Sequence, residues 1–231
     1  KVSRSKIDLY IECPRCFYID RRLGTGRPPG FPFNINSAVD NLLKAEFDAH
    51  RAQGSAHPLT RVAGLEVVPA PRDEMDDWRN NFKGVQYLHE PTNLILFGAI
   101  DDLWVDSSGT YFVVDYKATA KKEPVTKLDQ EWQAGYKRQM EIYQWLLRRN
   151  NLDVSNTGFF VYCTGNPNAP EFGGRVEFEV NLIPYVGNDD WVESTIEDLH
   201  NCLNYESVPD AGENCDYCAY IAAVGDTGSG K

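Results

Sequence analysis

Two stretches joined by a short polar turn decide the fold: Gly98-Ala-Ile-Asp-Asp-Leu-Trp-Val-Asp106 and Thr110-Tyr-Phe-Val-Val-Asp-Tyr-Lys117. Their β-branched and aromatic residues favour β-strands. The intervening Ser107-Ser108-Gly109 suits a three-residue hairpin loop in which the glycine takes the left-handed conformation. The sequence therefore predicts an antiparallel hairpin at this place.

This hairpin predicts a cluster of ionisable side chains. A three-residue loop pairs Asp106 with Thr110, and counting back along both strands sets Asp101 directly opposite Asp115. Lys117 lies two residues further on and therefore shares the face of Asp115. A loop one residue longer would put the two aspartates on opposite faces.

Two aspartates that face each other repel, and burying them together is costly unless a cation neutralises them. A divalent metal ion would do so, and oxygen-only ligands favour Mg²⁺ or Mn²⁺ over zinc. A metal ion beside Lys117 is suited to phosphodiester hydrolysis, because the ion activates water while the lysine positions that water or stabilises the developing charge. The alternative interpretation is a solvated hairpin end with a surface ion pair to Lys117.

The remaining pattern predicts a mixed α/β domain. A helix begins near Ser3 and is interrupted by Pro14. Apolar spacing predicts further helices, and alternation or apolar runs predict further strands. The helices are expected over 36–51, 132–149 and 191–203, and the strands over 61–68, 157–163 and 175–183.

Composition limits the class of protein. The 231 residues include 23 Lys and Arg against 34 Asp and Glu, a net charge of -11. This acidity argues against a protein that coats nucleic acid non-specifically. The apolar runs are too short for a membrane span and no signal segment opens the chain, so we expect a cytoplasmic protein without membrane contact. We expect one domain over residues 1–222 and a flexible Gly-rich tail over 223–231.

The cysteines have the spacing of a metal site. Cys13 and Cys16 form one close pair, and Cys215 and Cys218 form another at the opposite end of the chain. The two remaining cysteines stand alone, at positions 163 and 202, where we expect packing roles.

Several motifs in order resemble the PD-(D/E)XK nuclease superfamily, and most closely its RecB-like and Cas4-like branch. They are Gly98-Ala-Ile-Asp101, Asp115-Tyr-Lys117 and Gln139-Met-Glu-Ile-Tyr143, together with an opening segment, Ser5 to Arg15, that ends in Cys-Pro-Arg. The resemblance implies a restriction-endonuclease-like mixed β-sheet core flanked by helices, with the chain termini tied by a cysteine metal site.

The resemblance also implies roles for individual residues. Asp101 and Asp115 would hold the metal, Lys117 would be the catalytic lysine, and Gln139 and Tyr143 would support the site or contact nucleic acid. The backbone carbonyl of Tyr116 would be a further metal ligand.

One expected metal ligand departs from the pattern. Many RecB-like proteins have a histidine in the helix where this sequence has Asp40, so Asp40 would take that role. A carboxylate can bind Mg²⁺ there. The alternative is that Asp40 only solvates the helix.

For the cysteines, the resemblance implies a four-cysteine [4Fe-4S] cluster that holds the terminal segments together. Such nucleases usually place one cysteine in the N-terminal segment and three in the C-terminal segment, whereas this chain has two in each. Tetrahedral Zn²⁺ and free thiols therefore remain as alternatives to the cluster.

Together these features predict a Mg²⁺- or Mn²⁺-dependent deoxyribonuclease that acts as an exonuclease on duplex ends or single-stranded DNA. By resemblance, repair, recombination and defence are compatible pathways, and a helicase or another nucleic-acid-processing protein is a possible partner. The alternative is a non-catalytic nucleic-acid-binding or scaffold module with a structural zinc or iron-sulfur site. Most aromatic residues fall at core spacing, so the sequence predicts no base-stacking platform.

Overall fold

The computed structural model describes residues 1–30 and 34–228. Its α-helices are α1 (Arg4–Glu12), α2 (Pro14–Arg21), α3 (Asn34–Gln53), α4 (Pro58–Val62), α5 (Met75–Trp78), α6 (Ala134–Arg149), α7 (Asp190–Leu203) and α8 (Asp216–Gly228). Its strands are β1 (Val2–Ser3), β2 (Val67–Pro69), β3 (Val85–His89), β4 (Leu94–Gly98), β5 (Asp102–Asp106), β6 (Tyr111–Ala120), β7 (Thr157–Gly165) and β8 (Phe178–Val186). Two 3₁₀ turns are η1 (Glu90–Thr92) and η2 (Glu131–Gln133).

The chain divides into two compact units. One holds both terminal segments, with α1, α2, α7 and α8, together with Leu88–Leu96. The other holds the rest of the chain, which runs from α3 to β8 with Leu88–Leu96 left out. The single domain expected over residues 1–222 stays a prediction.

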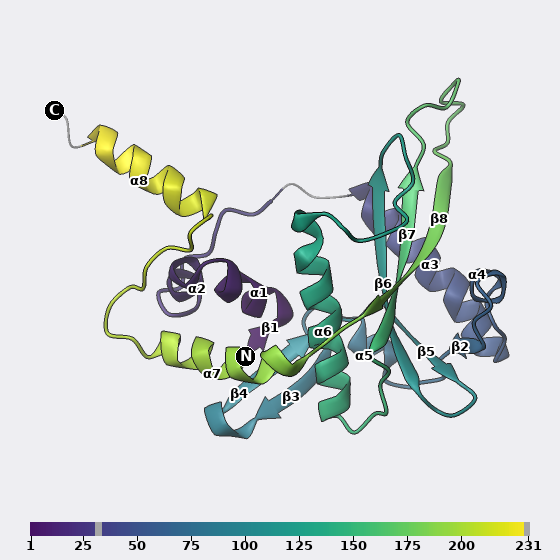
Figure 1. Ribbon diagram of the computed structural model, residues 1–231, viewed down its shortest axis with the longest axis horizontal. Coiled ribbons are helices and arrows are strands. Elements are labelled where there is room, and N and C mark those ends of the chain that lie inside the picture. Colours follow the sequence, from purple (N-terminus) through teal and green to yellow (C-terminus); the bar gives the residue numbers. More distant parts are fainter. Residues whose placement is uncertain (31–33, 229–231) are drawn as a thin grey trace. The chain divides into compact units, whose positions relative to one another are not determined.

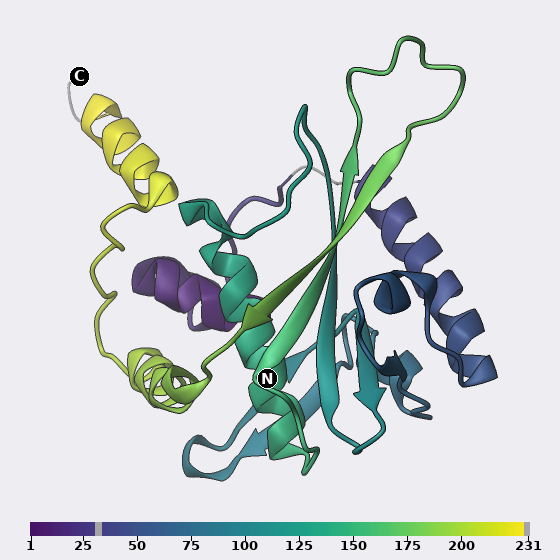
Figure 2. The same cartoon turned by 45° about the vertical axis from the view of Figure 1, so that its right-hand side comes forward.

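A five-stranded mixed sheet forms the centre of the second unit, with the strand order β2-β5-β6-β7-β8 (Figure 1). Strands β6 and β7 run parallel, and the other neighbours are antiparallel. Helices α3 and α6 lie on opposite sides of this sheet (Figure 2). The predicted fold class, a mixed β-sheet flanked by helices, is therefore confirmed.

The predicted register of the hairpin is also confirmed. Leu103 pairs with Val113 across β5 and β6. The backbone N–H of Asp106 donates to the carbonyl of Thr110 at 3.1 Å, and Gly109 has a φ of 89°, as the short loop requires.

The first face of the sheet is closed by aromatic packing from α3. Phe47 is fully buried, and its ring stacks on Trp104 of β5 and Tyr116 of β6 with centroid distances of 5.4 and 5.8 Å. Leu43, one turn earlier, joins the same cluster. This packing holds α3 against the two hairpin strands.

The second face is closed by α6, whose apolar residues recur at the spacing of a helix. Met140, Tyr143 and Leu147, three and four residues apart, are buried. Tyr143 lies so close to the backbone of Gly98 that a Cβ atom there would lie 2.6 Å from the Tyr143 ring. A glycine is therefore needed at the end of β4 for α6 to pack at this distance.

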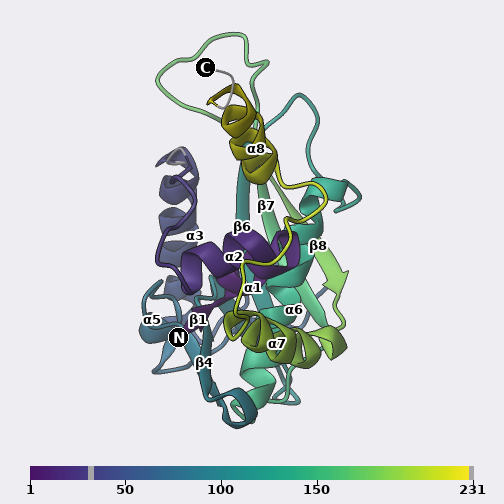
Figure 3. The ribbon, with the colours of Figure 1, turned by 90° about the vertical axis from the view of Figure 1, so that its left-hand side faces the viewer.

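In the first unit, α1, α2 and α7 lie side by side (Figure 3). The Tyr18 hydroxyl of α2 donates to the carbonyl of Tyr205 at 3.1 Å. The buried His89 lies 2.8 Å from a carboxylate oxygen of Glu193 on α7. Helix α7 is thus fixed to both chain segments that precede it in this unit.

The strand expected over 61–68 is wrong, because Pro58 begins the short helix α4 with the His57 side chain as its N-cap, and the strand β2 starts only at Val67. Helix α8 includes residues 223–228, and 229–231 lie outside the described residues, so the flexible tail expected over 223–231 stays a prediction. Across the described helices, none combines the length and apolar character needed to cross a membrane.

Replacing Gly98 tests the close packing of α6. We expect Gly98→Ala to lower the free energy of unfolding by about 1–3 kcal/mol, because the added methyl group must displace the Tyr143 ring. Urea denaturation measures this change. Gly30→Ala is the control, since a Cβ atom there meets no atom within 4 Å. Equal stability of the two variants would contradict the packing described.

Candidate functional site

Strand β6 supplies the buried centre of the candidate site. The side chain of Asp115 is fully buried, and the ammonium of Lys117 forms an ion pair with it on the same face of the strand. Burial alone would lower the pKa of Lys117, but the charges of Asp115 and Asp101 outweigh it and raise the pKa above its ordinary value. Lys117 is therefore a cation at neutral pH.

Asp101 lies beside this pair, as the hairpin register predicts. One of its carboxylate oxygens accepts a hydrogen bond of 2.8 Å from the backbone N–H of Tyr116. Its side chain is 23% exposed, so the carboxylate faces solvent while it is held against β6.

Helix α6 contributes a polar pair on the face toward β6. The amide of Gln139 donates to Asp115 at 2.8 Å and lies 3.0 Å from the hydroxyl oxygen of Tyr143. Lys117 donates to the other end of the Gln139 amide at 3.4 Å. The structure thus brings together the five side chains that the sequence predicted as catalytic, Asp101, Asp115, Lys117, Gln139 and Tyr143.

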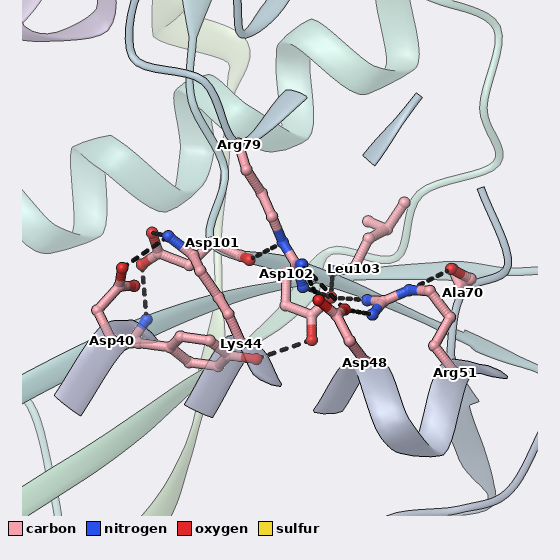
Figure 4. Close-up of polar contacts among 10 residues, drawn as sticks. Asp40, Lys44, Asp48, Arg51, Ala70, Arg79, Asp101, Asp102 and Leu103 are labelled. Carbon is pink, nitrogen blue, oxygen red and sulfur yellow. Dashed lines mark hydrogen bonds and ion pairs between the residues drawn. The ribbon is translucent and has the colours of Figure 1, made fainter. Parts of the chain in front are cut away.

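Helix α3 brings Asp40 to the site through a lysine that the sequence analysis did not single out. The ammonium of Lys44 lies 2.8 Å from a carboxylate oxygen of Asp40 and 3.7 Å from one of Asp101 (Figure 4). The spacing of four residues between Asp40 and Lys44 was visible in the sequence, and it indicates an ion pair on a helix. It could not reveal the contact with Asp101.

Asp40, Asp101 and Asp115 contact lysines of the chain. Among the described residues, the four cysteines are the group of three or more possible metal ligands whose ligand atoms all lie within 4.8 Å of one another. Asp40 and Asp101 are bridged by Lys44, and Asp115 is paired with Lys117. Cations of the chain itself thus balance the negative charge of these carboxylates.

A second, fully buried carboxylate lies next to the site. Asp102 forms ion pairs with Arg51 and Arg79 (Figure 4), and it accepts a hydrogen bond of 2.7 Å from the hydroxyl of Tyr116. Burial raises the pKa of Asp102, and the two arginines oppose that rise. The charge of Asp102 is thus compensated from two sides.

This buried network reaches the backbone of the site. The guanidinium of Arg79 donates to the carbonyl of Asp101 at 2.8 Å and also pairs with Asp48. Tyr116 contacts Asp102 through its hydroxyl and Asp101 through its backbone N–H. The network therefore holds Asp101 and Tyr116 in place, although neither arginine was singled out from the sequence.

The four cysteines form a separate cluster in the first unit. The sulfur of Cys13 lies 3.7 Å from that of Cys218, and the sulfur of Cys16 lies 3.5 Å from Cys215 and 3.6 Å from Cys218. The two single cysteines, at positions 163 and 202, are buried and stand outside the cluster. All four predicted cysteine ligands therefore lie together.

Hydrogen bonds favour the thiolate of one cysteine in this cluster, Cys13, whereas burial raises the pKa of Cys16 and of Cys218. Burial would raise the pKa of Cys13, but backbone N–H groups of Gly212 and Cys16 donate to its sulfur at 3.2 and 3.4 Å and help to lower the pKa to about 6. Arg27 adds a positive charge, with a guanidinium nitrogen 3.4 Å from the sulfur of Cys215.

Comparison with known proteins gives one family match. The family model of the PD-(D/E)XK nuclease superfamily matches residues 1–223. The crystal structure of a protein named SSO0001 is similar, with 14% sequence identity, a TM-score of 0.42, and coverage of 96% of this chain and 84% of that one. No curated protein sequence matches the chain.

The buried network yields a prediction about stability. We expect Arg79→Met to lower the free energy of unfolding by about 3–5 kcal/mol, because it leaves the buried charge of Asp102 with one cationic partner fewer. Chemical denaturation measures the loss. The control is Arg175→Met, which removes an exposed arginine 3.6 Å from Glu177 and should cost less than about 1 kcal/mol. A similar small cost for both variants would show that the network does not stabilise the fold.

Proposed function

The chain belongs to the PD-(D/E)XK nuclease superfamily, and we propose that it is a metal-dependent nuclease that hydrolyses phosphodiester bonds in DNA. The observation that carries this proposal is the contact of Lys117 and Gln139 with the buried Asp115, beside Asp101, at one end of the β5–β6 hairpin. These are the residue types and the order of motifs on which the resemblance to this superfamily rests.

The donor set fits a hard divalent cation. We propose Asp40, Asp101, Asp115 and the backbone carbonyl of Tyr116 as the groups that hold Mg²⁺ or Mn²⁺, since all of them offer oxygen. Lys44, placed between Asp40 and Asp101, supports this fit because it shows that these carboxylates accept a positive charge between them. A bound ion of this kind polarises a phosphoryl oxygen and lowers the pKa of a bound water.

The chain's own residues have distinct tasks in this proposal. Lys117 remains protonated, so it stabilises negative charge that develops on the phosphate, or orients the attacking water. Gln139 donates to Asp115 and fixes the direction of that carboxylate. Tyr143 in turn contacts Gln139 and positions its amide.

The more specific parts of the proposal rest on the sequence resemblance. They are the RecB-like and Cas4-like branch, exonuclease action on DNA ends or single strands, and a role in repair, recombination or defence. A helicase partner and a cytoplasmic location also stay predictions. The rival is a nucleic-acid-binding module without turnover.

The cysteine cluster is proposed as a structural metal site. In a tetrahedral zinc site with Zn–S bonds of about 2.3 Å, neighbouring sulfurs lie about 3.8 Å apart. Three of the six sulfur separations are 3.5 to 3.7 Å and all six are within 4.8 Å, which supports a single ion of this kind. In a [4Fe-4S] cluster each sulfur binds a different iron, so the cluster holds the four sulfurs further apart. We therefore favour Zn²⁺ over the iron-sulfur cluster that the resemblance implies.

Cleavage of end-labelled DNA tests the nuclease proposal. We expect Mg²⁺ or Mn²⁺ to support cleavage by the wild type and EDTA to abolish it. Asp115→Asn and Lys117→Met should each slow cleavage by about a hundredfold or more, because one removes a charged metal ligand and the other removes the cation at the reacting phosphate. The measurement is the cleavage rate on single-stranded and duplex substrates.

The control for this experiment is Lys127→Met, which removes a lysine of an exposed ion pair with Asp129 and should cleave at the wild-type rate. Thermal melting of each variant separates loss of chemistry from loss of fold. Cleavage that persists at the wild-type rate in Asp115→Asn would refute the assigned site, and binding without cleavage by the wild type would favour the non-catalytic module.

Metal analysis tests the cysteine site. Protein purified without oxygen should contain one zinc ion per chain and should lack the visible absorbance of an iron-sulfur cluster. We expect Cys215→Ser to lose this metal and to melt roughly 5–10 °C lower, because ligand loss removes metal-binding free energy from the folded state. Cys202→Ala is the control, since Cys202 is buried in the same unit but lies outside the cluster. Iron with acid-labile sulfide, or Cys215→Ser with unchanged metal content, would contradict this assignment.

A further inference from the structure

An exposed tryptophan lies near the candidate site. Trp132, in the turn η2 just before α6, is 53% exposed, although an indole is among the most apolar side chains. Its ring meets the ring of Tyr136 edge to face, with centroids 5.7 Å apart. Trp132 is therefore packed against Tyr136 of α6, while about half of its surface remains exposed to solvent.

Positive charges lie at both ends of this aromatic pair. The ammonium of Lys121 lies 5.0 Å from the centroid of Trp132, and that of Lys117 lies 4.6 Å from the centroid of Tyr136. A continuous row of side chains thus leads from Lys117 in the candidate site through Tyr136 and Trp132 to Lys121.

The backbone under Trp132 is fixed before any ligand binds. Gln130 and Gln133 form a reciprocal capping box around η2, in which the Gln130 N–H donates to the Gln133 side chain at 2.9 Å. Gln133 itself is 1% exposed. The neighbours of Trp132 are thus anchored, so a ligand that covers the indole need not order this turn.

We propose that Trp132 stacks on an unpaired nucleobase of the substrate, while Lys121 contacts the adjoining phosphate. This inference rests on the proposed function, and it specifies single-stranded nucleic acid, or the frayed end of a duplex, as the substrate class. The exposed part of the indole accepts the face of any base, and the lysine over its ring turns to the phosphate that each nucleotide carries. Bases inside a duplex present no free face, which favours an unpaired strand over continuous duplex.

Binding to a fluorescein-labelled oligothymidylate tests this role. The anisotropy of the oligonucleotide is measured in EDTA, so that no cleavage interferes, for the wild type, Trp132→Ala, Trp132→Phe and Phe82→Ala. We expect Trp132→Ala to weaken binding by about tenfold, because one base–aromatic contact is lost, while Trp132→Phe retains most of the affinity. Phe82→Ala, which removes an aromatic ring that is 87% exposed in the same unit, should bind like the wild type.

A covalently closed DNA dumbbell, a duplex with a short loop at each end and no free strand end, serves as the duplex probe, and its affinity should change little in Trp132→Ala. Equal affinity of wild type and Trp132→Ala for the oligothymidylate would overturn the inference. So would a loss that Trp132→Phe does not rescue, because that result indicates a role other than stacking.

The inference and the proposed function can fail separately. Tight binding that depends on Trp132 without cleavage in Mg²⁺ or Mn²⁺ would remove the nuclease proposal and keep the stacking role. Cleavage with an unchanged KM in Trp132→Ala would remove the stacking role and keep the nuclease. If the wild type binds neither probe and cleaves no DNA in Mg²⁺ or Mn²⁺, both are refuted.

Discussion

The antiparallel pairing of β5 with β6 is the constraint on which the candidate site depends. With Leu103 opposite Val113, the carboxylate of Asp101 reaches the backbone N–H of Tyr116, next to the buried Asp115. A shift of one residue would turn every side chain of one strand to the other face of the sheet. The short loop with Gly109 in the left-handed conformation selects this register, and burial of the strand residues on both faces of the sheet maintains it.

Burial of negative charge is the main cost of this arrangement, and the structure offsets it with cations of its own. Lys117 pairs with Asp115, Lys44 bridges Asp40 and Asp101, and two arginines surround Asp102. The sets differ in exposure. Asp102 is buried in the core and its arginines fix the backbone, whereas Asp40 and Asp101 are partly exposed. In the proposed function, the lysine between Asp40 and Asp101 gives way to the metal ion.

The cysteine cluster solves a different problem in the first unit. Its ligands come from the junction of α1 with α2 and from the start of α8, segments separated by about two hundred residues. Closing so long a loop by packing alone is entropically costly, and the metal ion that we propose at these cysteines would offset this cost. The close approach of Gly212 to the backbone of Glu12 and Cys13, where no Cβ atom would fit, shows how tightly the two segments meet.

The sequence by itself determined the hairpin, its register, the helical spacing of Gln139 and Tyr143, and the two close cysteine pairs that supply the metal-site pattern. Each of these follows from local periodicity or from a short motif. Only the tertiary structure decided which distant charges meet. Lys44 and Arg79 look like ordinary surface residues in the sequence, and their contacts with Asp101 arise from the packing of separate elements around the hairpin. The exposure of Trp132 was hidden for the same reason, since an aromatic residue beside an amphipathic helix predicts a core position until the helix is placed on its sheet.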